Sequence, residues 1–247
     1  MIVLENETHY LLIDQHEHAL LSGCFAHYLH PKYPEHHYEL SLATALHDTS
    51  WIDLDYDLPW DEINRKPYDF ITLPISIRLP MYQKGIDKLE KMTKYGAYLT
   101  SLHYCSFFKK NATDTQVVTF LQTEKERRER LKKSFKYPKT DTDFFWLQFF
   151  DDLSLYTCLN PPGVSKENEH PWYKNGIFNK SLNLNVQVKW LNERTILVEP
   201  FMFVESFQAK IHYRKCRKSL GHLDPDLHTI YSKTITFISE ESLYTGI

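Results

Sequence analysis

Glycine is scarce in this chain, with 7 glycines among 247 residues. Loops that cradle a phosphate need glycines where the backbone approaches the ligand closely, and neither GxGxxG nor GxxxxGK[ST] occurs. The sequence therefore disfavours the nucleotide-binding folds that are built on these loops.

The chain also has no large excess of positive or of negative charge. The formal net charge is −3 at pH 7, which is too small to predict binding to nucleic acid or to an anionic membrane surface. We therefore expect no nucleic-acid partner and no membrane partner. The sequence leaves the oligomeric state open.

Cysteine motifs and long apolar runs are missing as well. No CxxC motif occurs, and the cysteines lie far apart at positions 24, 105, 158 and 216, which favours reduced thiols over a disulfide framework or a zinc ribbon. No run of 18 apolar residues is present, and Glu5, Glu7 and His9 interrupt the apolar start of the chain. We expect a cytoplasmic protein without a secretory signal.

Helical patterns fill most of the first 160 residues. Apolar residues recur at helical spacing in stretches at about 14–28, 34–48, 82–93, 95–110, 113–136 and 141–159. A short hairpin is expected before them, at residues 2–13. These patterns predict a mainly helical domain over residues 1–160.

The pattern changes after residue 160. Pro161, Pro162 and Gly163 end the last helix and begin a polar linker. Beyond it, LNVQVKWL, FQAKIHYRKC and HTIYSKTITFIS alternate apolar and polar residues, which predicts antiparallel strands. We expect residues 161–247 to be a linker plus a smaller β element, packed as one unit with the helical part, and the N-terminal hairpin is able to join that sheet.

Residues 40–55, LSLATALHDTSWIDLD, carry the most unusual feature of the chain. A helix of small and apolar residues ends in His47-Asp48. Burying a carboxylate costs several kcal/mol unless a partner or a metal ion takes up its charge. A compensating group is therefore expected elsewhere in the chain.

Residues of metal-ligating type project from several predicted helices, toward apolar faces or helix ends. They are His18, His47, Asp48, His103 and Asp151. A single helix-facing histidine is more often a hydrogen-bonded core residue. What distinguishes this set is its order along the chain: a His, then His-Asp at a helix end, then a His, then an Asp.

Imidazole and carboxylate ligands together are more typical of catalytic than of structural metal sites. The set therefore predicts a divalent cation, with Mn, Fe, Co, Zn, Ni and Mg as candidates. Asp48 and His103 are the expected catalytic residues, with His103 either binding a second ion or contacting the substrate. Asp152 and Gln148 are weaker candidates for orienting a ligand.

This order of residues, with the phrase LATALHDTSW, resembles the HD superfamily of metal-dependent phosphohydrolases. The stretches QHEHALLSG, YLTSLHYCSFF and FFDDLSLYTCL are similar to an uncharacterised bacterial branch with an appended β portion. The resemblance implies an HD-like helical bundle core and a metal bound by His18, His47, Asp48 and Asp151. It also implies hydrolysis of a small phosphate ester or nucleotide, as a phosphomonoesterase or a phosphodiesterase, without fixing the substrate.

Residues 49–80 are expected to border the pocket, because they leave directly from His47-Asp48 and form too long a loop for a simple connection. Trp51 is either a pocket wall or a core side chain. Arg65, Lys66 and Arg78 are the nearby cations able to contact an anionic substrate.

Two other functions remain compatible with these residues. One is a metal-stabilised, non-catalytic binding module whose tyrosine-rich surface contacts a partner. The other is a di-iron oxygenase, because some proteins with a similar arrangement use two irons to oxidise substrates with O₂.

Overall fold

The computed structural model describes residues 1–35, 37–109, 111–136 and 140–245. Its helices are α1 (Gln15–Tyr28), α2 (Tyr38–Leu46), α3 (Ile52–Asp57), α4 (Ile75–Met92), α5 (Lys94–Ser106), α6 (Thr115–Leu131), α7 (Thr140–Leu159) and α8 (Ser242–Thr245). Its strands are β1 (Ile2–Glu5), β2 (His9–Ile13), β3 (Trp60–Asp61), β4 (Lys66–Pro67), β5 (Ile177–Asn179), β6 (Leu184–Asn192), β7 (Thr195–Glu199), β8 (Phe207–Arg217) and β9 (Tyr231–Ile238).

One curled sheet contains strands from both ends of the sequence. Its order is β1-β2-β8-β9-β7-β6-β5, and β3 with β4 forms a separate two-stranded ribbon. Neighbouring strands of the large sheet are antiparallel except β7 and β9, which run parallel. The hairpin β1–β2 reaches the rest of the sheet through β8, so strands from before and after residue 160 share one sheet.

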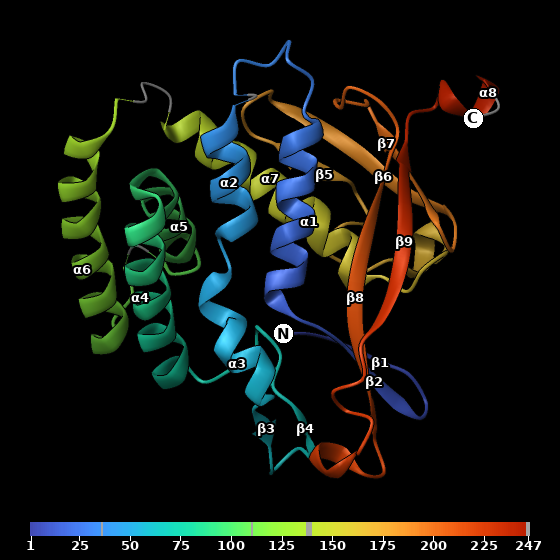
Figure 1. The fold of residues 1–247 in the computed structure, drawn as a ribbon, viewed down its shortest axis with the longest axis horizontal. Coiled ribbons are helices and arrows are strands. Elements are labelled where there is room, and N and C mark those ends of the chain that lie inside the picture. The colour runs from blue at the N-terminus through green and yellow to red at the C-terminus, as the bar shows by residue number, and fades with distance from the viewer. Residues whose placement is uncertain (36, 110, 137–139, 246–247) are drawn as a thin grey trace.

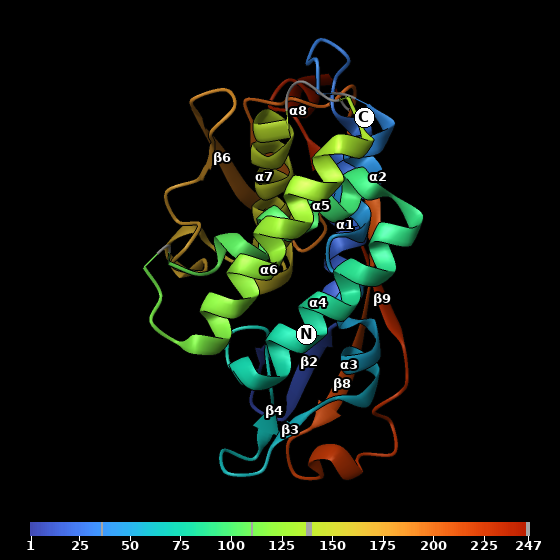
Figure 2. The same cartoon turned by 90° about the vertical axis from the view of Figure 1, so that its left-hand side faces the viewer.

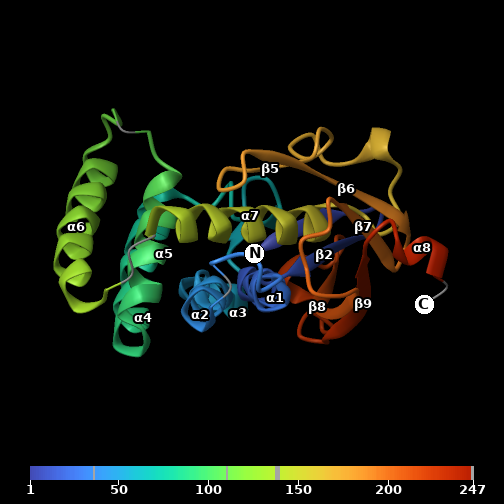
Figure 3. The same ribbon diagram turned by 90° about the horizontal axis from the view of Figure 1, so that it is seen from above.

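Helices α1 to α7 gather on one side of this sheet, as Figure 1 shows with the sheet on the right, and the short α8 lies beyond the sheet near the C-terminus. Helix α1 packs against β8, and α7 packs against β5 and β1. Seen from above in Figure 3, α7 runs across the molecule from α5 to the sheet. Figure 2 shows α4, α5 and α6 in front, on the side away from the sheet.

The sheet contributes a large part of the hydrophobic core. Strand β6 alternates buried and exposed residues, and Val186, Val188 and Trp190 face the interior. Phe25 of α1 lies edge-on to Phe237 of β9, with ring centroids 4.8 Å apart. Each such buried side chain contributes about 1.5–3 kcal/mol to folding.

The expected fold class, a mainly helical HD-like bundle with a smaller C-terminal β element, is therefore wrong. Helix, with the short 3-10 turns included, accounts for 47% of the described residues and strand for 21%, and the seven-stranded sheet does not fit an HD-type helical fold. The reason is that a short strand cannot bury its apolar face alone. The sheet becomes part of the core because the hairpin and the C-terminal strands join and pack on α1 and α7.

The lengths and compositions of the helices bear on membrane insertion. Among the described residues, no helix is both long and apolar enough to span a bilayer. The cytoplasmic location stays a prediction, since the fold does not identify a compartment.

Helices α1 and α2 approach each other closely beside Gly23. A Cβ atom at this position would lie 2.4 Å from Cβ and 2.7 Å from Cα of Ala45. Real Cβ atoms do not come this near to backbone atoms, so only glycine permits the contact. The contact matters for function because α1 carries His18 and His47 directly follows α2.

We predict that Gly23→Ala destabilises the protein by about 1–2 kcal/mol, because overpacking against Ala45 outweighs the gain in helix propensity. Urea unfolding followed by circular dichroism measures this change. The control Leu20→Ala, on the exposed side of α1, should change the free energy of unfolding by only about 0.5 kcal/mol. Unchanged stability in Gly23→Ala would contradict the close approach of the two helices.

Candidate metal centre

The five predicted ligands converge on one buried point, although they come from four different helices or helix ends. His18 lies in α1, His47 caps α2 and is followed by Asp48, His103 lies in α5, and Asp151 lies near the middle of α7. All five are buried. Tertiary packing of α1 against α2 and α7, and of α5 against α2 and α7, brings them together.

The distances between donor atoms are those of a compact cluster. His18 Nε2 lies 2.8 Å from Asp48 Oδ2, and His47 Nε2 lies 3.7 Å from the same oxygen and 3.3 Å from Asp151 Oδ1. His103 Nε2 lies 3.7 Å from Asp151 Oδ2. Two triads with mutual distances within 4.8 Å result, His18-His47-Asp48 and His47-His103-Asp151, and they share His47.

The tautomer of His47 fits a metal ligand. Its Nδ1 lies 2.7 Å from the carbonyl oxygen of Thr44 and donates to it, which leaves a lone pair on Nε2 in the neutral ring. This Nε2 is fully buried and has no hydrogen-bond partner in the described part of the chain. A histidine anchored through one nitrogen, with the other facing carboxylates, is the arrangement typical of a metal-binding imidazole.

His18 lies between Ser154 and Asp48, which contact its two ring nitrogens. Its Nδ1 lies 2.8 Å from Ser154 Oγ, and the Ser154 hydroxyl lies 2.8 Å from the Asp151 carbonyl oxygen, to which it donates. His18 Nε2 lies at hydrogen-bond distance, 2.8 Å, from Asp48 Oδ2, so a hydrogen on Nε2 donates to this carboxylate. A metal ion bound at Nε2 would take the place of that hydrogen.

The electrostatics of the cluster keep both carboxylates ionised. Burial acts to raise the pKa of Asp48, but His47 and His18 hold this pKa well below its usual range. Burial likewise opposes ionisation of Asp151, and His47 with His103 lowers its pKa. Two ionised, buried carboxylates require a positive charge beside them.

The pKa values of His47 and His103 shift in opposite directions. Burial acts to lower the pKa of His47, but Asp48 and Asp151 together raise it to about 9. Burial lowers the pKa of His103 to about 4, and Asp151 offsets only part of this effect. The cluster therefore holds a proton on His47 or, in its place, a metal ion that binds the deprotonated ring.

Side chains around the cluster fix the position of Asp48. The Tyr104 hydroxyl lies 3.1 Å from Asp48 Oδ1 and 2.8 Å from the His47 carbonyl oxygen, and it also contacts the Ser50 hydroxyl. Gln15 donates through Nε2 to Asp48 Oδ2 at 3.1 Å. Gln15 and Tyr104 were not predicted as site residues, although they stand in the quoted stretches QHEHALLSG and YLTSLHYCSFF. Helical spacing did not single them out, since Tyr104 stands one residue after His103 and is turned by about 100° from it.

A cavity of about 480 Å³ opens beside the cluster. It is lined by Gln15, His18, Asp48, Trp51, Phe70, Ile71, Arg78, Tyr82, His103, Ser106, Phe107, Gln148, Asp151, Asp152, Leu155 and Trp172. The cluster thus forms part of the wall of a pocket that a small molecule can enter.

The segment at residues 49–80 borders this pocket through Trp51, Phe70, Ile71 and Arg78. Trp51 is only 3% exposed and packs edge-on against Tyr82, so it is a core side chain that also forms a wall. Neither Arg65 nor Lys66 lines the cavity, since both lie on the β3–β4 ribbon and its turn.

The two weaker candidates also line the pocket. Burial and the neighbouring Asp151 raise the pKa of Asp152 to about 7, and Asp152 Oδ1 accepts from the Tyr173 hydroxyl at 3.3 Å. Gln148 Oε1 accepts from Lys180 Nζ at 3.1 Å. Neither belongs to the two triads.

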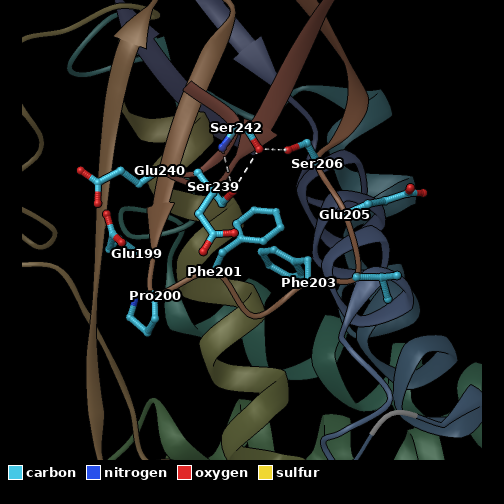
Figure 4. A pocket seen from close by; sticks show the side chains of 11 residues that line it. Glu199, Pro200, Phe201, Phe203, Glu205, Ser206, Ser239, Glu240 and Ser242 are labelled. Carbon is cyan, nitrogen blue, oxygen red and sulfur yellow. Dashed lines mark hydrogen bonds between the residues drawn. The ribbon is translucent and has the colours of Figure 1, made fainter. Parts of the chain in front are cut away.

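A second and larger cavity, of about 770 Å³, lies apart from the histidines at the end of the sheet near α8. Figure 4 shows Glu199, Glu205 and Glu240 around Phe201 and Phe203. None of the histidines and cysteines that the structure describes lines it. Acidic side chains alone do not define a ligand, so the smaller pocket is the better candidate site.

We predict that Mn²⁺, Co²⁺ or Zn²⁺ raises the thermal midpoint of the protein and that a chelator reverses the rise. A ligand at 100 times its Kd adds about 2.7 kcal/mol of stability, which corresponds to about 5–10 °C in a chain of this size. Asp48→Asn should lose the response. Asp53→Asn, which removes an exposed ion pair with Lys88, should keep it, and a wild-type midpoint indifferent to all three ions would contradict the site.

We also predict that Tyr104→Phe weakens metal binding by about 10–100-fold, as expected for a group that orients a ligand without binding the ion. Competition with a chromophoric chelator measures the affinity. Tyr98→Phe is the matched control, because Tyr98 lies on the same helix with its ring against Phe135. Equal affinity of both variants and the wild type would show that Tyr104 does not position Asp48.

Comparison with known proteins identifies a family without a known activity. No curated protein and no solved structure matches the chain. Residues 1–218 match a family other than the HD superfamily. The HD resemblance is therefore wrong. The short His-Asp phrase and the order of the ligands are compatible with a different fold. The chain belongs to the family described as "Protein of unknown function (DUF3891)".

Proposed function

We propose that the protein is a metal-dependent hydrolase that acts on a small phosphate ester. The observation that supports this proposal is the pairing of two features in one pocket. A cluster of three histidines and two aspartates lies beside it, with His18, Asp48, His103 and Asp151 in its wall, and a single arginine, Arg78, lies among its lining residues.

The donor set matches particular metal ions. Three imidazoles and two carboxylates suit Zn, Mn, Fe, Co or Ni, whereas Mg²⁺ prefers oxygen ligands. His18, His47, Asp48 and Asp151 would hold one ion. Because His47 belongs to both triads, His103 has two possible roles, as a ligand of a second ion or as a contact to the substrate.

A bound divalent ion would supply a Lewis acid and lower the pKa of water toward about 7. The chain's own residues would do the rest. Tyr104 and Gln15 hold Asp48 in place, and the burial of the cluster excludes bulk water from its inner side. The pKa of His103 is low, so its ring stays neutral at physiological pH and is able to bind a metal ion or accept a hydrogen bond.

Arg78 is suited to bind the phosphate. Its Nη1 donates to the Phe70 carbonyl oxygen at 3.3 Å, and its Nε is buried without a hydrogen-bond partner in the described segments. It forms no ion pair with a carboxylate there. A guanidinium that lines a pocket and is not neutralised by a carboxylate is a good partner for a phosphate, which accepts charge-assisted hydrogen bonds from it.

A substrate panel tests the hydrolase directly. Protein purified without added metal is first analysed for its metal content, and phosphomonoesters and phosphodiesters are then assayed with Mn, Co, Fe, Zn and Mg. Metal-dependent turnover that Asp48→Asn abolishes would support the proposal. Bound metal without turnover would favour the binding module, and oxygen-dependent turnover with iron would favour the oxygenase.

We predict that Arg78→Gln lowers kcat/KM for a phosphate ester by about 10–100-fold, because a charge-assisted hydrogen bond to the phosphate is lost. Arg78→Lys should recover part of the activity. Arg65→Gln is the control, since Arg65 lies outside the cavity lining, and it should leave kcat/KM unchanged. A loss of metal content in Arg78→Gln would instead assign Arg78 a structural role.

A further inference from the structure

Large apolar side chains gather around the mouth of the pocket while remaining open to solvent. Trp172 is 54% exposed, Ile71 is 52% exposed and Phe107 is 50% exposed, and all three line the cavity. Single exposed apolar residues are common on proteins and need no explanation. Several exposed apolar residues around one pocket do need an explanation, because exposing apolar area to water is unfavourable.

These side chains reach the mouth from three separate parts of the chain. Ile71 follows the β3–β4 ribbon, Phe107 ends α5, and Trp172 lies in the turn region after the Pro161-Pro162-Gly163 break. Local sequence therefore does not explain why they meet. The fold brings them together in the lining of the cavity beside the histidine and aspartate cluster.

The aromatic surface continues inward from this mouth to the cluster. The Phe70 ring lies edge-on to Trp172, with centroids 6.3 Å apart. The centroid of the Phe107 ring lies 4.7 Å from that of the His103 ring and 6.3 Å from that of the Tyr82 ring. A ligand would thus meet aromatic rings at the mouth, and Arg78 and the cluster further in.

We propose that the substrate is a phosphate ester whose alcohol part carries a planar aromatic ring, held between Trp172 and Phe107. The inference rests on the proposed hydrolase for the phosphate part, and it adds the class of the alcohol. Arg78 binds the phosphate beside the cluster, and the mouth covers the ring. Aromatic contacts of this kind add to the affinity beyond the burial of apolar area.

Binding of non-hydrolysable phosphonates tests the proposal without turnover. Benzylphosphonate and ethylphosphonate carry the same charge and differ in the ring, and calorimetry gives their Kd values for the metal-loaded protein. We expect benzylphosphonate to bind about tenfold more tightly to the wild type, as one or two aromatic contacts provide. Trp172→Ala and Phe107→Ala should each reduce this preference, and Trp172→Phe should retain most of it.

The matched control is Phe178→Ala. Phe178 is also half exposed, at 53%, but it lies on β5 and outside the cavity lining, so its removal should leave the preference intact. Equal affinity for the two phosphonates, absence of binding by both, or an equal weakening of both in Trp172→Ala would overturn the aromatic assignment.

Turnover of benzyl and ethyl phosphate separates this inference from the proposed hydrolase. Their alcohols leave with similar ease, so a difference in kcat/KM reports recognition of the ring. Hydrolysis of both esters at equal kcat/KM would refute the aromatic class and keep the hydrolase. A benzylphosphonate preference without hydrolysis of either ester would refute the hydrolase and keep the aromatic mouth. An aryl phosphate and a nucleoside monophosphate, compared next, distinguish a simple ring from a nucleobase.

Discussion

The charge of two buried carboxylates governs the architecture of the site. Asp48 and Asp151 are held ionised inside the protein, and the histidines around them supply the compensating interactions. Removing such a charge from water costs several kcal/mol unless it is paired. Four helices or helix ends must therefore stay in register around one point, because a shift of any of them would leave a buried charge without a partner.

The packing that keeps this register is close and specific. Gly23 lets α1 approach α2, which places His18 beside His47. Helix α7 extends from the helices to the sheet and carries Asp151 in its middle. The curled sheet is thus part of the support of the site, since α1 rests on β8 and α7 rests on β1 and β5.

Sequence periodicity predicted where individual helices and strands lie in the chain, but it did not predict how they pack together. The expected hairpin at residues 2–13 is present as β1 and β2, and the helices expected at about 14–28 and 141–159 correspond to α1 and α7. Hydrophobic period is a local property, so it identifies these segments. The pairing of β2 with β8 joins residues about two hundred positions apart, and no local pattern contains that information. This is why the fold class expected from the sequence was wrong.

The sequence by itself determined the types of group available to the site: the His-Asp pair at a helix end, histidines on apolar faces, and an aspartate on the inner side of a helix. Only the tertiary structure decided that these groups meet, that Tyr104 and Gln15 hold Asp48, and that Arg78 faces the same cavity whereas Arg65 and Lys66 do not. The physical reason is that helical spacing fixes the direction of a side chain relative to its own helix. Convergence depends on how helices and sheet pack, which is set by contacts between residues far apart in the chain.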